Sequence, residues 1–264
     1  MINWRQLRRR LTPTWLRTDA RRRRRDVFLR RLGVARCHTP PILTREPDLF
    51  VRSWLPYVVA HELLRNGDAT FLQIGAFDGV GDDDLGELIK ARRLRGVLVE
   101  PQPAAFARLK QTYAGQPQVV LLQAAIAERE GVRELFIRKS KTSMAASFDR
   151  EHLRRHNIPN RDIASIPVPC HTVASALGLA GLETVAIIQI DAEGYDWPII
   201  RSIDFERVRP AIVRFEYRNM PPSDADACLA HLASRGYRFL LERRDIIALR
   251  QPEARPAVRP ARVA

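Results

Sequence analysis

The sequence predicts an α/β fold built on a parallel sheet, and two short apolar runs with a helix between them are the main reason. Residues 71–74 and 96–99 are almost entirely apolar, as is typical of strands buried on both faces of a parallel sheet. Between them, Leu85, Leu88 and Ile89 recur at the spacing of one helical face. Strand, helix and strand in this order form the opening βαβ unit of a nucleotide-binding α/β domain.

The loop after the first strand and the acid after the second strand predict a ligand. Gly75, Gly79 and Gly81 permit a sharp turn, and Glu100 follows 19 residues after the last of them. An acid about 20 residues beyond a glycine loop typically accepts hydrogen bonds from ribose hydroxyls. The loop reads G-A-F-D-G-V-G rather than G-x-G-x-x-G, so it favours S-adenosylmethionine over a dinucleotide. The alternative is that these residues serve packing alone.

Carboxylates also follow later strands, where we expect the chemistry. Residues 185–190 form the strongest buried strand of the chain, and Asp191 and Glu193 come directly after it. Ligands of open parallel sheets bind outside the carboxyl ends of the strands. Glu216 ends another strand, so we expect a third acid facing the same cleft. The alternative is that Asp191 and Asp196 cap the following helix, which suits Asp196 better.

Several blocks of the sequence resemble one family. In order, they read IGAFDG, VLVEP, AAIAEREG, IQIDAEGYDWPII and RFEY. Over about residues 50–250 the chain resembles the FkbM family of S-adenosylmethionine-dependent methyltransferases. The resemblance implies a Rossmann-like class I methyltransferase fold, with a seven-stranded, mostly parallel sheet and helices on both faces. It also implies O-methylation of a hydroxyl on a glycan or natural product.

The resemblance also implies roles for individual residues. The residues expected to bind S-adenosylmethionine are Gln73, Gly75, Ala76, Asp78, Gly79, Glu100, Pro101, Ala124, Ala125 and Asp191. The catalytic candidates are Asp191, Glu193 and Glu216. The family's first motif reads D-x-G-A-N-x-G, whereas here Gln73 stands in the acid position and Phe77 in the asparagine position. Gln73 can still hydrogen-bond the methionine part of the cofactor, without a charge.

The motif that is absent is also informative about the substrate. The block after residue 190 reads D-A-E-G and not the N/D-P-P-Y of amino-methylating nucleic-acid enzymes, so we expect no specific nucleic-acid partner. Two rival functions are a non-catalytic scaffold of the same fold, tethered through its basic arm to membrane or nucleic acid, and, with less support, an NAD-dependent oxidoreductase. Cofactor binding without turnover on any hydroxyl acceptor would favour the scaffold.

The positive charge of the chain is concentrated at its N-terminus. The 264 residues carry a formal net charge of +14, and residues 1–36, with thirteen Arg and two Asp, contribute +11 of it. We expect residues 1–48 to form a basic, partly disordered arm and linker, residues 49–250 the methyltransferase domain, and residues 251–264 a disordered tail. The arm is a solvated segment, a helix on an anionic membrane surface, or a non-specific nucleic-acid contact. Co-sedimentation with liposomes and with DNA at two salt concentrations separates the last two.

Cysteine spacing and hydropathy favour a cytoplasmic protein. Cys37, Cys170 and Cys228 are far apart and form no C-x-x-C pair, which argues against a zinc site or a disulfide framework. No apolar run approaches 18 residues, and no apolar segment follows the basic start as in a secretory signal. We expect a cytoplasmic enzyme that the basic arm can bring to the inner membrane.

Residues 139–169 are expected to form a long irregular insert that acts as a lid or substrate loop. His152 and His156 lie four residues apart within it and could share one helical face. Because no H-E-x-x-H pattern or third ligand accompanies them, we expect an exposed polar face and no metal.

Overall fold

The computed structural model describes residues 53–67, 69–80, 83–139, 144–242 and 244–251. The predicted basic arm and almost all of the predicted tail lie outside these residues, so the domain boundaries stay a prediction. Within the described part of the chain, no helix combines the length and the apolar character needed to span a bilayer.

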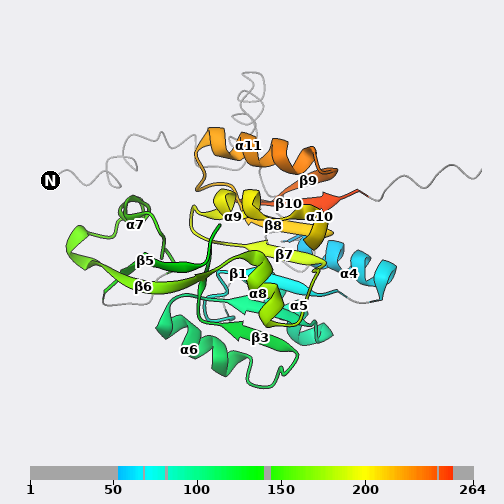
Figure 1. The fold of residues 1–264 in the computed structure, drawn as a ribbon, viewed down its shortest axis with the longest axis horizontal. Helices are drawn as coiled ribbons and strands as arrows, with labels where there is room; N and C mark the ends of the chain where they lie inside the picture. Colours follow the sequence, from blue (N-terminus) through cyan, green and yellow to red (C-terminus); the bar gives the residue numbers. More distant parts are fainter. Residues whose placement is uncertain (1–52, 68, 81–82, 140–143, 243, 252–264) are drawn as a thin grey trace, which may run out of the picture. The chain divides into compact units, whose positions relative to one another are not determined.

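A seven-stranded sheet forms the centre of the described region, in the order β3-β2-β1-β7-β8-β10-β9 (Figure 1). Its strands are β1 (Phe71–Ile74), β2 (Gly96–Val99), β3 (Val119–Leu122), β7 (Ile187–Ile190), β8 (Ile212–Glu216), β9 (Tyr237–Glu242) and β10 (Asp245–Arg250). Neighbouring strands from β3 to β8 are parallel, whereas β10 runs antiparallel to both β8 and β9. The predicted seven-stranded, mostly parallel sheet is therefore confirmed.

Helices cover both faces of this sheet, because alternate strand residues point to opposite sides. Leu72 and Ile74 pack with the helices α8 (Val173–Leu179), α9 (Asp196–Ser202), α10 (Phe205–Val208) and α11 (Pro222–Ala233). Phe71 packs on the other face with α4 (Leu55–Asn66), α5 (Asp84–Arg92) and α6 (Pro103–Thr112). Each fully buried aliphatic or aromatic side chain contributes about 1.5–3 kcal/mol, so the two apolar layers hold the strand ends firmly in place.

Local signals in the sequence account for where several helices begin. The Asp83 carboxylate accepts from the backbone N–H of Gly86 at 2.9 Å and caps α5. The Thr172 hydroxyl accepts from Ser175 N–H at 3.1 Å and caps α8. Helix α4 has a proline in its first turn, where the missing N–H costs nothing.

A second, three-stranded sheet corrects the prediction of an irregular insert. It consists of β4 (Ala125–Ile126), β6 (Ile163–His171) and β5 (Gly131–Arg138), in that order, and extends from one end of the main sheet with α7 (Arg150–Arg155) (Figure 1). A short 3-10 helix, Asn160–Asp162, precedes β6. Strand β6 was missed because Pro167 and Pro169 normally argue against a strand. They stand at alternate positions of a strand paired along its whole length with β5, so they remove N–H donors on one side only.

Candidate active site

The carboxyl ends of three central strands converge on one cavity. Gly75 follows β1, Glu100 follows β2 and Asp191 follows β7, and all three line it. The cavity encloses about 640 Å³ of unfilled space, part of which opens to solvent. Among the residues predicted to bind the cofactor or to take part in catalysis, those that line the cavity are Gly75, Glu100, Pro101, Ala124, Ala125, Asp191 and Glu193. The second sheet and the segment before α7 supply a further wall, with Leu135, Met144, Ala146, Ser147 and Phe148.

Glu100 is held rigidly at the end of β2. Its two carboxylate oxygens accept hydrogen bonds from the backbone N–H groups of Phe77, at 2.9 Å, and Gln102, at 2.8 Å. The side chain is only 3% exposed, and this burial raises the pKa of Glu100 to about 7, although the two N–H donors act in the opposite direction. A carboxylate has about four lone-pair sites, so acceptor capacity remains on both oxygens.

Gly75 lets the ends of β1 and β7 approach each other. Its φ is +80°, and a Cβ atom placed there would lie 2.0 Å from the backbone oxygen of Asp191. Any side chain at this position would therefore push the two loops apart. The glycine fixes the position of the Asp191 backbone as well as lining the cavity.

Four residues predicted to contact the cofactor do not line the cavity. Ala76 is 3% exposed and packs in the core beneath α5 and α6. Gly79, with φ +68°, lies against the Tyr113 ring, and Asp78 forms an ion pair of 3.5 Å with Arg108. Gln73 points to the opposite face of the sheet and donates from Nε2 to Asp83 at 3.0 Å.

Asp191 carries an unusual charge environment. Its side chain is open to the cavity, and among the described residues it has no hydrogen-bonding partner. Although this side chain is exposed to the cavity, the protein atoms around it displace part of its hydration, and this desolvation is the main cause that raises the pKa of Asp191 to about 7. Repulsion by the carboxylates of Glu193 and Glu216 raises it further.

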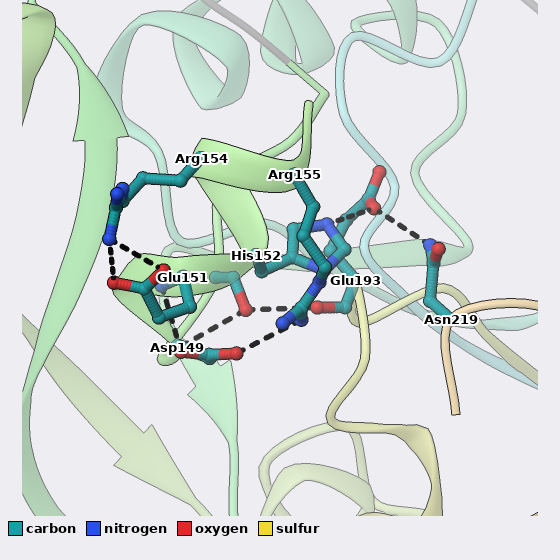
Figure 2. A network of polar contacts seen from close by, with 8 residues as sticks. Asp149, Glu151, His152, Arg154, Arg155, Glu193 and Asn219 are labelled. Atoms are coloured by element: carbon teal, nitrogen blue, oxygen red, sulfur yellow. Dashed lines mark hydrogen bonds and ion pairs between the residues drawn. The ribbon is translucent and has the colours of Figure 1, made fainter. Parts of the chain in front are cut away.

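Glu193 is held by two contacts that the sequence did not predict. Its Oε2 lies 2.8 Å from His152 Nε2 and 3.4 Å from Asn219 Nδ2, and the same amide donates to Glu216 Oε2 at 2.5 Å. Figure 2 shows His152 and Asn219 approaching the Glu193 carboxylate from two sides. His152 is 1% exposed, so the prediction of an exposed polar face is wrong for this residue. The sequence drew attention to His152 only through its spacing of four residues from His156. That spacing does not reveal a hydrogen-bonding partner 41 residues away.

Glu216, the third acid predicted at the cleft, lies behind the cavity lining. Its side chain is 9% exposed, and burial followed by the nearby Glu193 carboxylate raises its pKa. It reaches the site through its hydrogen bond with Asn219, which connects it to Glu193. The structure thus brings all three predicted acids together but opens only two of them to the cavity.

Asp196 is not the helix cap expected from the sequence. The residue before α9 is Tyr195, which forms no side-chain cap, and Asp196 is the first residue of the helix. The buried Asp196 carboxylate instead accepts from the backbone N–H groups of Ala192, at 3.4 Å, and Glu216, at 3.2 Å. It fastens the loop after β7 to the end of β8. Complete burial and the nearby Asp191 raise the pKa of Asp196 well above its ordinary value.

The comparisons with known proteins agree with this geometry. The family model described as the methyltransferase FkbM domain matches residues 73–239, which is well over half of the chain. The chain belongs to the FkbM methyltransferase family. Comparison with curated proteins gave no significant match.

Solved structures similar to this FkbM methyltransferase are class I methyltransferases of low sequence identity. The ribosomal protein L11 methylase of Lactobacillus delbrueckii subsp. bulgaricus is 12% identical over 70% of this chain and 71% of its own, with a TM-score of 0.36. The N-methyltransferase NodS of Bradyrhizobium japonicum WM9 is 11% identical over 73% and 94%, with a TM-score of 0.37. The N-terminal domain of human METTL16, in complex with SAH, is 10% identical over 81% and 71%, with a TM-score of 0.35.

The FkbM methyltransferase uses S-adenosylmethionine, and the residues of the cavity fit this cofactor. Glu100 offers a fixed acid with spare acceptor sites, which suits a pair of ribose hydroxyls. Small and apolar side chains follow on the same wall, as an adenine ring requires: Val99, Pro101, Ala124, Ala125 and Ile126.

Aromatic residues form the wall of the cavity next to the acids. The rings of Phe148 and Tyr195 meet edge to face, with centroids 5.0 Å apart. The Arg133 guanidinium lies 4.1 Å from the Phe148 centroid and 4.8 Å from the Tyr195 centroid. Tyr195 Oη also donates to Glu128, which pairs with Arg201 at 2.9 Å. These contacts fix the two rings beside Asp191 and Glu193.

Side chains able to bind a metal gather in two groups at this site of the methyltransferase. They are His152, His156 and Glu193, and Asp191, Glu193 and Glu216, with donor atoms in each group within 4.8 Å of one another. The contact of His152 with Glu193 and the contacts of Asn219 with Glu193 and Glu216 have the distances of hydrogen bonds. We therefore assign no metal to either group, and the expectation of a metal-free site stays a prediction.

Proposed function

We propose that this enzyme transfers the methyl group of S-adenosylmethionine to a hydroxyl group of a sugar or natural product. The observation that carries the proposal is the pair of carboxylates, Asp191 and Glu193, that lines the cavity next to the cofactor wall. The pKa of Asp191, raised to about 7, is suited to a group that takes up a proton near neutral pH.

The chemistry of methyl transfer to oxygen explains why an acid is useful there. The cofactor supplies a methyl group on a positively charged sulfur, which leaves as a neutral thioether without help from an acid. A hydroxyl is a weak nucleophile, so its proton has to be removed as the new C–O bond forms. In our proposal Asp191 accepts that proton, and Glu193 positions the hydroxyl or serves as the alternative base. A positioned base contributes roughly 10²–10⁴-fold, and alignment of the reactants about 7–11 kcal/mol in favourable systems.

The aromatic and apolar side chains of the cavity lining support a sugar-like or cyclic acceptor. Phe148 and Tyr195 present aromatic surface to the cavity, and Leu135 and Met144 extend it. Aromatic faces and carboxylates together suit a ring with apolar C–H faces and hydroxyl edges, because the rings cover the faces and the acids accept from the hydroxyls.

The experiment that tests the proposal is an acceptor screen with the full chain and S-adenosylmethionine carrying a ¹³C-labelled methyl. The expected product of a positive reaction has a mass higher by one labelled methylene and an NMR shift of an O-methyl group. The acceptors are neutral sugars, amino sugars, uronic acids and hydroxylated cyclic natural products. Transfer to nitrogen or carbon acceptors only, with none to oxygen, contradicts the proposal while leaving the methyltransferase activity intact.

A further inference from the structure

Residue 193 is fixed at two points by the segment between β5 and β6. The Ser147 hydroxyl donates to the backbone oxygen of Glu193 at 2.9 Å, and His152 Nε2 lies 2.8 Å from its carboxylate. Ser147 is 3% exposed and His152 is 1% exposed, so the two donor side chains are shielded from bulk water. Both come from a segment that is remote in sequence from β7.

Glu193 needs such support for two reasons. Its φ is +48°, a left-handed conformation that is strained for a residue other than glycine. Its carboxylate also lies within 4.8 Å of the carboxylates of Asp191 and Glu216, and like charges at that distance repel. A fixed hydrogen-bond donor to Glu193 offsets this repulsion between the carboxylates.

His152 supplies this donor from behind the carboxylate. It does not line the cavity, whereas Glu193 does, so the imidazole reaches an acceptor only through Glu193. The ring is itself fixed by stacking on His156, with centroids 4.5 Å apart and an angle of 30° between the planes. Helix α7, which carries His152, is capped by Asp149 and strengthened by the ion pair of Arg155 with Asp149 at 3.0 Å (Figure 2).

We propose that His152 is a positioning residue for methyl transfer: its Nε2–H holds the Glu193 carboxylate toward the cavity and thereby ties catalysis to the segment between β5 and β6. This inference rests on the proposed function, because Glu193 acts on the acceptor only if the enzyme methylates one. It assigns to His152 no direct contact with cofactor or acceptor.

The first test uses His152→Ala and His152→Gln with an acceptor found in the screen. His152→Ala is expected to lower kcat by about 10²-fold, the cost of a misplaced group, while the Kd of S-adenosylmethionine stays the same. His152→Gln restores an N–H donor at nearly the same reach and is expected to recover most of kcat. The matched control is His171→Ala, because His171 makes a similar contact with Glu130 at 2.9 Å but outside the cavity lining.

Thermal unfolding of each variant shows whether a lower kcat comes from a misplaced Glu193 carboxylate or from an unfolded protein. If His152→Ala unfolds, the comparison of His152→Gln with wild type still decides the matter. The double variant His152→Ala with Glu193→Gln is expected to lose no more kcat than Glu193→Gln alone, since the imidazole acts through that carboxylate. Additive losses, or an unchanged kcat in a folded His152→Ala, overturn the inference.

The second test needs no acceptor, so it stands even if the screen fails. Long-range ¹H–¹⁵N NMR spectra of the full chain report which imidazole nitrogen of His152 carries a proton. We expect a proton on Nε2 and a change in its shift on Glu193→Ala, with no change at His171. A His152 ring without a proton on Nε2 overturns the inference, whatever the outcome of the acceptor screen.

Discussion

Glu100 and Asp191 stand at the ends of the two strands that flank β1, and their carboxyl groups have similar pKa values but different partners. Burial raises the pKa of both carboxyl groups to about 7. Glu100 is enclosed and accepts from two backbone N–H groups, whereas Asp191 opens to the cavity and faces the carboxylates of Glu193 and Glu216. One acid is thus fixed by donors, and the other is destabilised by like charges.

This difference teaches that the partners of a carboxylate, and not its pKa alone, indicate its role. A carboxylate held by fixed donors keeps its lone pairs in place for further hydrogen bonds, which suits binding. Repulsion by nearby like charges favours the protonated form of a carboxyl group and so raises its pKa. A raised pKa suits a general base. The predictions below test whether Glu100 and Asp191 separate in this way.

The largest effect, on turnover, is expected when the two carboxylates that follow β7 are both replaced by amides. Asp191→Asn combined with Glu193→Gln should lower turnover by about 10²–10⁴-fold, because a positioned base is lost while shape is retained. The Kd of S-adenosylmethionine, measured by calorimetry, should change far less than the turnover. Glu130→Gln, a change of a carboxylate outside the cavity lining, is the control. Undiminished turnover in the double variant removes the proposed chemistry.

A smaller effect, on the affinity for the cofactor and not on turnover, is expected when Glu100 at the end of β2 is replaced. Glu100→Ala should weaken binding of S-adenosylmethionine by about 10- to 100-fold, since hydrogen bonds to charged groups are worth about 1.5–3 kcal/mol. The measurement is isothermal titration of the full chain, with Glu100→Gln as the variant that keeps size and loses charge. An unchanged Kd in Glu100→Ala shows that this acid does not hold the ribose.

The smallest expected effect is on the pH dependence of the reaction, and it distinguishes the role of Asp191 from that of Glu100 most clearly. Asp191 accepts a proton only when ionised, so kcat/KM should rise with pH through about 7. Glu216→Gln removes a charge that raises the pKa of Asp191, so the midpoint of this rise should move to lower pH. Glu216 is not among the causes of the shifted pKa of Glu100, so the pH dependence of cofactor binding should not move. Equal movement of both profiles would contradict the comparison.

Much of the site could be predicted from the sequence where the signals are local. An apolar run followed by an acid marks the carboxyl end of a buried strand, and this placed Glu100, Asp191 and Glu193 at one edge of the sheet. By the same rule Glu216 was expected in the cleft, yet it is buried, does not line the cavity and accepts a hydrogen bond from Asn219. The sequence could predict that Glu216 lies at the carboxyl end of a strand, but it could not predict whether its side chain faces the cavity.

The contacts between distant segments could not be predicted. Ser147 and His152 meet residue 193 only because β6 pairs with β5 and returns α7 to the site. Gln73 occupies the position of an acid in the family motif, yet it turns to the face of the sheet opposite the cavity lining and pairs with Asp83. Asp196 was expected as a cap from its place before a helix, and the fold uses it to join two loops instead.

The sequence by itself determined the strand ends, the turns between them and the acids that follow, because periodicity, glycines and caps act over a few neighbouring residues. Only the tertiary structure decided which of those acids opens to the cavity and which groups hold it. Hydrogen bonds and charge repulsion depend on distances of a few ångströms between segments far apart in the chain. His152 and Glu193 are 41 residues apart, and only folding brings them to 2.8 Å.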